Sequence, residues 1–374
     1  LRNNPIQNYI PWRAVLNRNS ISTPSRIVFD ASQPTSSGLS LNDILAKGKN
    51  NMNKLVEIVI RWSSHKTAFH SDIKKMYNSV QLSEEHWCLQ RYIWQNELEK
   101  GKLPEEKIIK TLIYGIRSSG NQSERGLCQT ANLSAAEYPE INQIVQQDIY
   151  VDDCLSGEES MKKAMLRADQ LELVLNRGGF SLKGVTFSGE DPPSTLSKDE
   201  ASINVAGMKW LSKDDLVSLD ISELNFAKKQ RGKKPIKNQN IIPLQLTRRH
   251  CVSKVAEIFD LTGKVTPITA TMKIDLHSLK QRRLDWDDTL PDDLRNIWTS
   301  HFEMMQEIGK IKYRRAIVPE EAANLNISTI DFGDASNKLA CAAIYARFLM
   351  KDGTFSCQLV FSRSKIVPDG LSQP

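Results

Sequence analysis

The spacing of hydrophobic and polar residues changes several times along the chain, and each change predicts a secondary-structure element. Apolar residues recur at helical spacing in 53–62 and in the long segment 160–176, which should end at Gly178-Gly179. Further helices are predicted at about 124–136, 253–259 and 291–310. Short apolar runs of β-forming residues predict strands at 26–30 and 67–72 and in the last fifty residues.

Two segments predict β-hairpins. In 149–155, Asp152 and Asp153 lie at the tip between two apolar arms. Side chains alternate along a strand, but at a tight turn both carboxylates can project to the same end. Residues 205–221 alternate sufficiently to predict a second hairpin.

Composition sets limits on the class of protein. The 374 residues are 40% hydrophobic and 25% charged, which is ordinary for a folded chain of two or three domains. No apolar run is long enough to predict a membrane span, and the first residues lack a signal peptide and a starting Met, as expected for an internal piece of a longer chain. The six scattered cysteines disfavour a zinc ribbon or a disulfide framework and favour a reducing compartment. Four of the six histidines, His65, His70, His86 and His250, show no metal-ligand spacing and indicate no site.

The net charge of +6 is modest, but basic residues concentrate in 221–250, where Glu223 is the only acid. This basic strip fits a solvated linker and a phosphate-contacting surface equally well. Its basic residues are Lys228, Lys229, Arg231, Lys233, Lys234, Lys237, Arg248 and Arg249.

The run Tyr150-Val-Asp-Asp153 is the clearest candidate for chemistry. Two adjacent carboxylates repel each other unless a divalent cation lies between them, as in phosphoryl-transfer sites. Asp72, at the end of the apolar strand 67–72, is the natural third carboxylate. Taken alone, an Asp-Asp pair is more typical of a solvated surface turn, so the context of both motifs carries the prediction.

The order of motifs resembles that of reverse transcriptases, in particular those of the BEL/Pao family of long-terminal-repeat retrotransposon polyproteins. The central motifs are Phe69-His-Ser-Asp72-Ile-Lys-Lys-Met-Tyr77, Tyr114-Gly-Ile-Arg-Ser-Ser119 and Tyr150-Val-Asp-Asp153. Supporting strings extend over nearly the whole chain, from Tyr9-Ile-Pro-Trp12 and Arg26-Ile-Val-Phe-Asp-Ala-Ser32 to Asp285-Trp-Asp-Asp288 and Phe332-Gly-Asp-Ala-Ser336.

The resemblance implies an RNA-directed DNA polymerase with two Mg²⁺ ions. Asp72, Asp152 and Asp153 would bind the metals, with help from the backbone carbonyl of Ile73. The resemblance also implies a nucleotide site, in which Arg26 clamps the triphosphate and Tyr77 blocks a sugar 2′-hydroxyl. Tyr114 and Gly115 would lie beneath the incoming nucleotide and the template base.

Further roles follow from the same resemblance. Gly207, Met208, Lys209 and Trp210 would form a primer-grip hairpin, and the basic strip would contact nucleic acid. Asp334 would be the first carboxylate of a ribonuclease H site whose other acids lie beyond Pro374. Lys183 is out of step with the family's usual motif, and no role is assigned to it.

The fold implied is α+β: a right-hand polymerase with an antiparallel palm sheet, then a helical connection and the start of a ribonuclease H-like domain. The expected domains are 1–222 (fingers and palm), 223–325 (thumb or connection) and 326–374 (truncated ribonuclease H-like start). The expected partners are an RNA or DNA template with its primer, dNTPs, and the protease, ribonuclease H and integrase segments of the polyprotein. No membrane partner is expected, and the location is an intracellular, cytoplasmic retrotransposon particle.

Two alternatives stay open. The same fold could persist as a nucleic-acid-binding relic without catalysis. The region after the polymerase has also been grouped with Pao-type aspartic peptidases, although Asp331-Phe-Gly and Asp334-Ala-Ser fit the Asp-Thr/Ser-Gly turn of such enzymes poorly.

Overall fold

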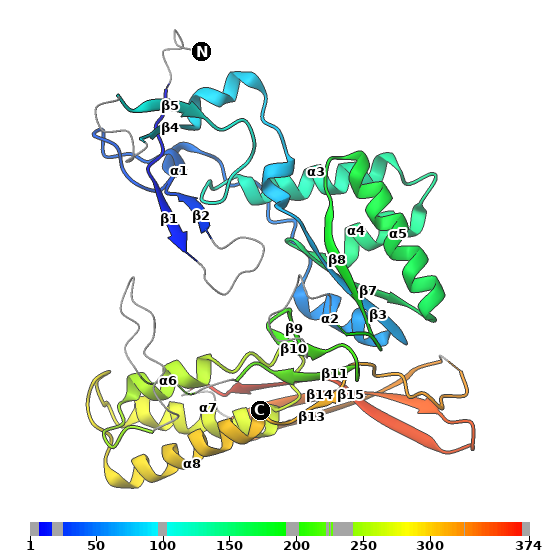
Figure 1. Ribbon diagram of the computed structural model, residues 1–374. Helices are drawn as coiled ribbons and strands as arrows, with labels where there is room; N and C mark the ends of the chain where they lie inside the picture. Colours follow the sequence, from blue (N-terminus) through cyan, green and yellow to red (C-terminus); the bar gives the residue numbers. More distant parts are fainter. Residues whose placement is uncertain are drawn as a thin grey trace. The chain divides into compact units, whose positions relative to one another are not determined.

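The computed structural model describes residues 7–16, 25–95, 103–191, 202–221, 224, 226, 242–324 and 326–368. The chain forms two compact units, the first of residues 1–62 and 67–200 and the second of residues 63–66 and 201–374 (Figure 1). These units are groupings by contact, and the expected division of the chain near 222 and 325 stays a prediction. None of the helices in the described ranges is long and apolar enough to cross a membrane.

The centre of the first unit is an antiparallel sheet in the order β6-β7-β3-β8. Its strands are β6 (Ile149–Tyr150), β7 (Asp153–Glu158), β3 (Thr67–Ile73) and β8 (Leu182–Phe187). Alternate residues of β3 face opposite sides of the sheet, and Phe69 and Ile73 belong to the buried core. That core is completed by α3 (Ser119–Leu133), α4 (Pro139–Gln147) and α5 (Met161–Arg177), which cover one face of the sheet (Figure 1).

The other elements of the first unit are short. The hairpin β1 (Trp12–Leu16) and β2 (Ser25–Phe29) and the pair β4 (Arg91–Trp94) and β5 (Glu105–Ile108) are antiparallel. The rings of Trp12 and Trp94 stack with centroids 4.8 Å apart, so the two pairs are in contact. The helical elements are α1 (Leu41–Ile44), α2 (Leu55–Ser64) and the 3₁₀ turns η1 (Met76–Ser79) and η2 (Glu84–Leu89).

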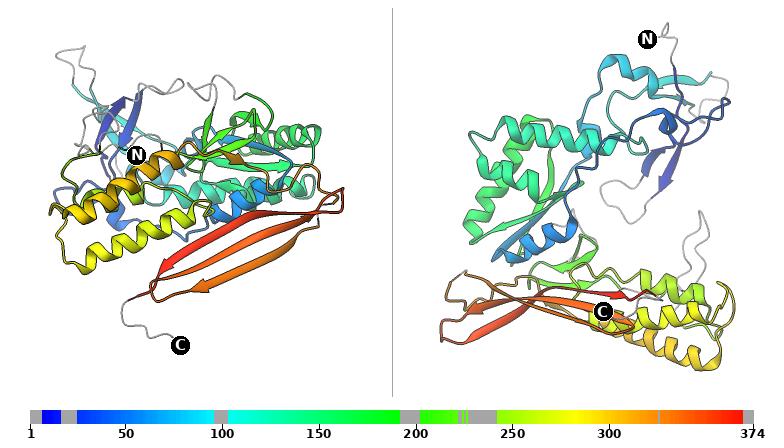
Figure 2. Two further views of the ribbon diagram at one scale, coloured as in Figure 1. Left: turned by 90° about the horizontal axis from the view of Figure 1, so that it is seen from below. Right: turned by 180° about the vertical axis from the view of Figure 1, so that it is seen from behind.

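In its described residues, the second unit combines two antiparallel sheets with three helices. One sheet has the order β12-β11-β10-β9, formed by β9 (Ile203–Val205), β10 (Met208–Leu211), β11 (Leu216–Leu219) and β12 (Tyr313–Arg314). The other is the long sheet β13 (Ser328–Ala335), β14 (Leu339–Leu349) and β15 (Phe355–Ile366) (Figure 2). The helices α6 (Arg248–Ala256), α7 (Thr266–Gln281) and α8 (Asp292–Ile308) share an apolar core that includes Trp298 and Phe302.

A buried ion pair ties the second unit together. Arg315, whose side chain is fully buried, donates two hydrogen bonds of 2.8 Å to the two carboxylate oxygens of Asp215. It also donates to the carbonyls of His65 and Lys66, while Trp210 Nε1 donates to Asp215 Oδ1 at 3.0 Å. This network explains why residues 63–66 group with the second unit.

Asp215→Ala is therefore expected to lower the free energy of unfolding by about 2–3 kcal/mol, because it leaves a guanidinium buried without its carboxylate. The figure lies below that for a fully buried pair because Asp215 is itself about a quarter exposed. Urea unfolding followed by tryptophan fluorescence measures the change. The exposed neighbour Asp214 provides the matched control, since Asp214→Ala should change the free energy by less than about 0.5 kcal/mol. Equal effects of the two variants would contradict a structural role for the pair.

Most predicted elements are present, with some differences. The helices predicted at 53–62, 160–176 and 291–310 are α2, α5 and α8, and α5 ends at Gly178 and Gly179 as expected. The helices predicted at 124–136 and 253–259 begin earlier, at Ser119 and Arg248. The helices α4 and α7 were not predicted: α4 is short, and α7 begins Thr-Pro-Ile-Thr-Ala-Thr, whose β-branched residues weaken a helical pattern.

Candidate active site

Three carboxylates meet at one end of the β6-β7-β3-β8 sheet. Asp72 in β3 lies directly opposite Asp153 in β7. Asp152 lies in the two-residue turn between β6 and β7, where Val151 adopts a positive φ of 57°. The backbone N–H of Ile73 donates to the carbonyl of Asp152 at 2.7 Å and so clasps this turn to β3. The turn therefore consists of Val151 and Asp152, while Asp153 is already the first residue of β7, which refines the predicted hairpin tip.

The three charges oppose one another. Burial first, and then the charge of Asp152, raise the pKa of Asp72 from its ordinary 3.8 to about 6; Asp153 adds to the rise, while Lys183 and His70 reduce it. Burial and the charge of Asp153 likewise raise the pKa of Asp152. Asp72 has a cation beside it in Lys183 of β8, whose Nζ lies 3.9 Å from Asp72 Oδ2. The site thus has an unbalanced negative charge.

Carboxylates are the ligands that Mg²⁺ prefers, and their mutual repulsion would be relieved by a divalent cation. The donor chemistry of Asp72, Asp152 and Asp153 therefore fits such an ion. Across the part of the chain that the structure describes, however, no three His, Cys, Asp or Glu side chains form a group that could hold a metal as they stand. The backbone of Ile73 is next to the site, through its bond to Asp152.

Asp72→Asn is expected to stabilise the metal-free protein. Because the folded-state pKa of Asp72 is raised, the native state binds the proton more tightly than the unfolded chain does. Stability is therefore lost as pH rises from about 4 through about 6, and the full penalty is present above that range. The full rise in the pKa of Asp72 corresponds to about 3 kcal/mol of unfolding free energy. Because 35% of the side chain is exposed and solvent screens its charge, the expected gain in stability of Asp72→Asn is roughly 1 kcal/mol.

Urea unfolding in EDTA at pH 7.5 and at pH 4 tests this effect. The unfolding free energy of Asp72→Asn should exceed that of the parent at pH 7.5 and equal it at pH 4. The control is Asp169→Asn, on an exposed position of α5, whose unfolding free energy should equal that of the parent at both pH values. If Asp72→Asn is less stable than the parent at pH 7.5, the charge of Asp72 does not destabilise the folded protein and the prediction is wrong.

The residues predicted to form the nucleotide site lie close to these carboxylates. The rings of Tyr77, in η1, and Tyr114 meet edge to face with centroids 4.3 Å apart. Burial and then the charge of Asp152 raise the pKa of both phenols. Arg26, in β2, is close enough for its charge to lower the pKa of Asp152 and of Tyr114. The structure thus brings these three side chains together with the acids.

Gly115 follows Tyr114 with a φ of +101°, and a Cβ built there would lie 2.4 Å from the carbonyl oxygen of Phe29. Only glycine allows this close approach of two backbone segments. The side-chain amide of Asn42 also donates to the Gly115 carbonyl at 2.8 Å, so the segment that carries Tyr114 is fixed on both sides.

The predicted primer-grip residues lie in the second unit. Gly207 precedes β10 with a φ of +79°, and a Cβ there would meet the ring of Phe259 at 2.7 Å. Met208 and Trp210 are buried in the core, and Lys209 pairs with Asp220 at 3.1 Å. Trp210 thus has a packing role in this unit.

The basic strip is described only at its end, because Lys228, Lys229, Arg231, Lys233, Lys234 and Lys237 lie outside the described residues. Arg249 forms two hydrogen bonds with the carboxylate of Asp287, at 2.8 and 2.9 Å, which balance its charge. The guanidinium of Arg248 lies over the ring of Trp286 at 4.7 Å and donates to the carbonyl of Leu284.

Asp334 lies in β13, where its carboxylate accepts a hydrogen bond from the backbone of Ala335 at 2.9 Å. No cluster of acids accompanies it in the described ranges.

Two residues near the acids were not predicted. His70 showed no sequence partner, yet its Nε2 lies 3.1 Å from Asp153 Oδ1. Lys183 faces Asp72 from β8. The period of two along β3 could have indicated His70, because residues 70 and 72 share one face of the strand.

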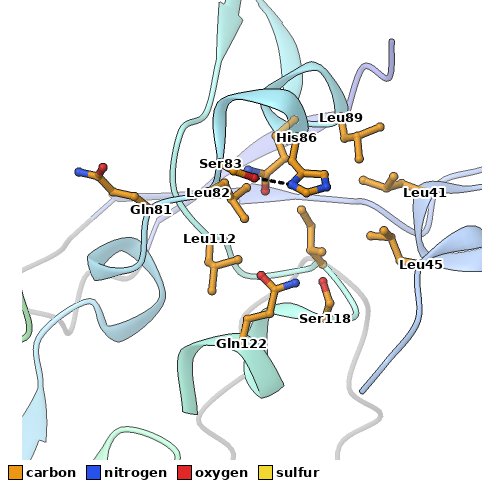
Figure 3. A pocket seen from close by; sticks show the side chains of 12 residues that line it. Leu41, Leu45, Gln81, Leu82, Ser83, His86, Leu89, Leu112, Ser118 and Gln122 are labelled. Carbon is orange, nitrogen blue, oxygen red and sulfur yellow. Dashed lines mark hydrogen bonds between the residues drawn. The ribbon is translucent and has the colours of Figure 1, made fainter. Parts of the chain in front are cut away.

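The first unit also contains a pocket of about 350 Å³ that includes none of the three acids. Its walls include the apolar side chains of Leu41, Leu45 and Leu112 (Figure 3). His86 lines it as well, with Nδ1 2.7 Å from the hydroxyl of Ser83.

The mixed helix-and-sheet fold resembles that of solved retroviral reverse transcriptases. The chain resembles the structure of the foamy viral protease-reverse transcriptase dRH in complex with ds DNA, with a TM-score of 0.58 and 14% identity over 96% of this chain and 52% of that one. It also resembles the foamy viral protease-reverse transcriptase in complex with RNA/DNA hybrid (TM-score 0.52, 13% identity, 97% of this chain and 40% of that one). For the same enzyme in complex with dsDNA, the TM-score is 0.55 and the identity 13%, over 96% of this chain and 62% of that one. The chain thus spans about half the length of these neighbours. The mixed helix-and-sheet fold expected from the sequence is confirmed at this level.

A family model matches the C-terminal part of the chain. Residues 247–373 match the model of the Pao retrotransposon-like RNaseH-like domain. No curated protein matches the sequence. The family match begins within the segment expected to be a thumb or connection, and its description names a ribonuclease H-like domain rather than a peptidase. Together with the fold, it supports a retroelement polyprotein as the source of this chain.

Proposed function

We propose that the chain is the RNA-directed DNA polymerase core of a BEL/Pao-type retrotransposon polyprotein, acting inside an intracellular particle. The observation that carries the proposal is the meeting of Asp72, Asp152 and Asp153 at one sheet edge next to the Tyr77–Tyr114 ring pair and Arg26. In this proposal, the β6-β7-β3-β8 sheet is the palm, and the segments containing β1, β2, β4 and β5 are the fingers.

Each group of the site has a proposed part in nucleotidyl transfer from a dNTP to a primer 3′-hydroxyl. Asp72, Asp152 and Asp153, with the Ile73 carbonyl, would hold two Mg²⁺ ions, which when bound supply positive charge for the attacking hydroxyl and the pyrophosphate leaving group. Arg26 offers a planar fork of donors to the triphosphate. Tyr77, braced by Tyr114, presents a fixed ring edge against the sugar.

Substrate and partners follow from the same proposal. The solved neighbours were captured with ds DNA or with RNA/DNA hybrid, and a template–primer duplex is the proposed nucleic acid for this chain. The remaining proposed partners are dNTPs and other segments of the polyprotein. The ribonuclease H role of Asp334 is proposed only as part of a site completed by acids outside the described residues.

Primer extension on an RNA template with Mg²⁺ and all four dNTPs tests the proposal. Stepwise lengthening of the primer to the end of the template is the expected result. Tight binding of the duplex without any extension would refute the polymerase and favour a nucleic-acid-binding relic of the same fold.

A further inference from the structure

His70 lies where it can orient one of the three carboxylates. It is two residues before Asp72 on the same face of β3, and its side chain is buried. Its register partner on β7 is Leu155, so Asp153 is its diagonal neighbour, within reach of a long side chain. The contact is direct, with 3.1 Å between His70 Nε2 and Asp153 Oδ1.

The chemistry of the two groups determines the direction of this hydrogen bond. An ionised carboxylate can only accept, so Nε2 of His70 carries the hydrogen and donates it to Asp153. The other ring nitrogen, Nδ1, is buried, and within the described residues it has no hydrogen-bond partner. The hydroxyl oxygen Oγ1 of Thr186, the residue opposite His70 on β8, is also buried and also has no hydrogen-bond partner within the described residues.

An imidazole is a costly choice for this position if packing alone is considered. A buried polar atom without a partner carries a desolvation penalty, whereas an aliphatic side chain of similar size does not. Asp153, by contrast, is more than a third exposed, so water can solvate its carboxylate if His70 is removed. The contact therefore contributes little to stability and much to the orientation of Asp153.

We propose that His70 is a positioning residue that fixes the carboxylate of Asp153 for divalent-cation binding, an inference that rests on the proposed polymerase function. Orienting partners of this kind hold a metal ligand in place before the metal arrives, and their loss typically weakens metal binding ten- to a hundredfold. His70 acts through Asp153 and does not itself bind the metal or the substrate.

Two variants of the full chain separate positioning from packing. His70→Leu removes the donor and the orphaned nitrogen together. His70→Gln keeps an amide N–H at about the distance of Nε2 from the backbone. Mn²⁺ binding, followed by electron paramagnetic resonance of the free ion in the absence of nucleic acid, gives the affinity, and thermal unfolding in EDTA gives the stability.

His70→Leu is expected to bind Mn²⁺ about tenfold more weakly while its unfolding temperature stays equal or rises. His70→Gln should recover an affinity within about threefold of the parent. Leu155→Val, a change at the register partner of His70, is the packing control and should lower the unfolding temperature without changing the affinity.

The outcomes distinguish the two proposals. If His70→Leu lowers the unfolding temperature and leaves Mn²⁺ affinity unchanged, His70 is a packing residue and the inference is wrong, while the polymerase proposal stands. If the parent chain binds no Mn²⁺ and extends no primer, the proposed function itself fails.

Discussion

Asp152→Asn is expected to lower the rate of RNA-templated primer extension by about a thousandfold or more, because it removes a charge at the centre of the site. The charge of Asp152 acts on Asp72, Tyr77 and Tyr114, raising the pKa of each. The substitution keeps the shape of the side chain. The turn itself should persist, since it is clasped to β3 by the backbone carbonyl of residue 152 rather than by its carboxylate.

Single-nucleotide incorporation under saturating duplex and Mg²⁺ measures the effect. Asp169→Asn, which removes the same charge from an exposed position of α5, is the control and should extend at the parental rate. Circular dichroism should show equal folding of all three proteins. Parental activity in Asp152→Asn would remove the carboxylate cluster from the proposed chemistry.

Tyr77→Ala is expected to raise the incorporation of ribonucleotides relative to deoxyribonucleotides by roughly a hundredfold, in line with the discrimination available from steric exclusion in a pocket. The ring of Tyr77 is held in place by its edge-to-face contact with Tyr114. Its neighbour in η1, Met76, is buried in the core. A ring fixed in this way cannot swing aside for an added 2′-hydroxyl.

The ratio of catalytic efficiencies for rNTP and dNTP with one template base measures the discrimination. Tyr77→Phe is the matched control: it keeps the ring and removes only the hydroxyl, so its ratio should stay within about threefold of the parent. Should Tyr77→Ala and Tyr77→Phe give the same ratio, the ring is not the barrier to ribonucleotides.

Local patterns were sufficient for the elements that carry the acids. The strand 67–72, the hairpin around Asp152 and the helix 160–176 are recognisable because their periods of two and 3.6, and the glycines at the end of α5, are properties of neighbouring residues. The candidate triad was predicted from the order and context of the motifs, because an Asp-Asp pair taken alone is more typical of a solvated surface turn. The helix α7 was missed because its first turn, Thr-Pro-Ile-Thr, reads locally as β-branched, although packing against α8 and α6 makes it helical.

Pairings between distant residues were beyond such patterns. His70 reaches Asp153 only because β3 and β7 pair in one register, and a shift by one residue would turn His70 to the other face. Arg249 likewise pairs with a residue that is distant in the chain, Asp287, whereas the run of basic residues around Arg249 had suggested an unpaired charge.

The sequence by itself determined most of the elements, the order of the motifs and the three candidate acids, because these depend on residues that are close together in the chain. The tertiary structure decided the raised pKa of Asp72, the burial of Arg315 against Asp215 and the contact of His70 with Asp153. The burial of a side chain and the pairing of its charge depend on all the residues around it in space. These residues can be far away in the chain, as with Arg315 and Asp215, which lie about a hundred positions apart.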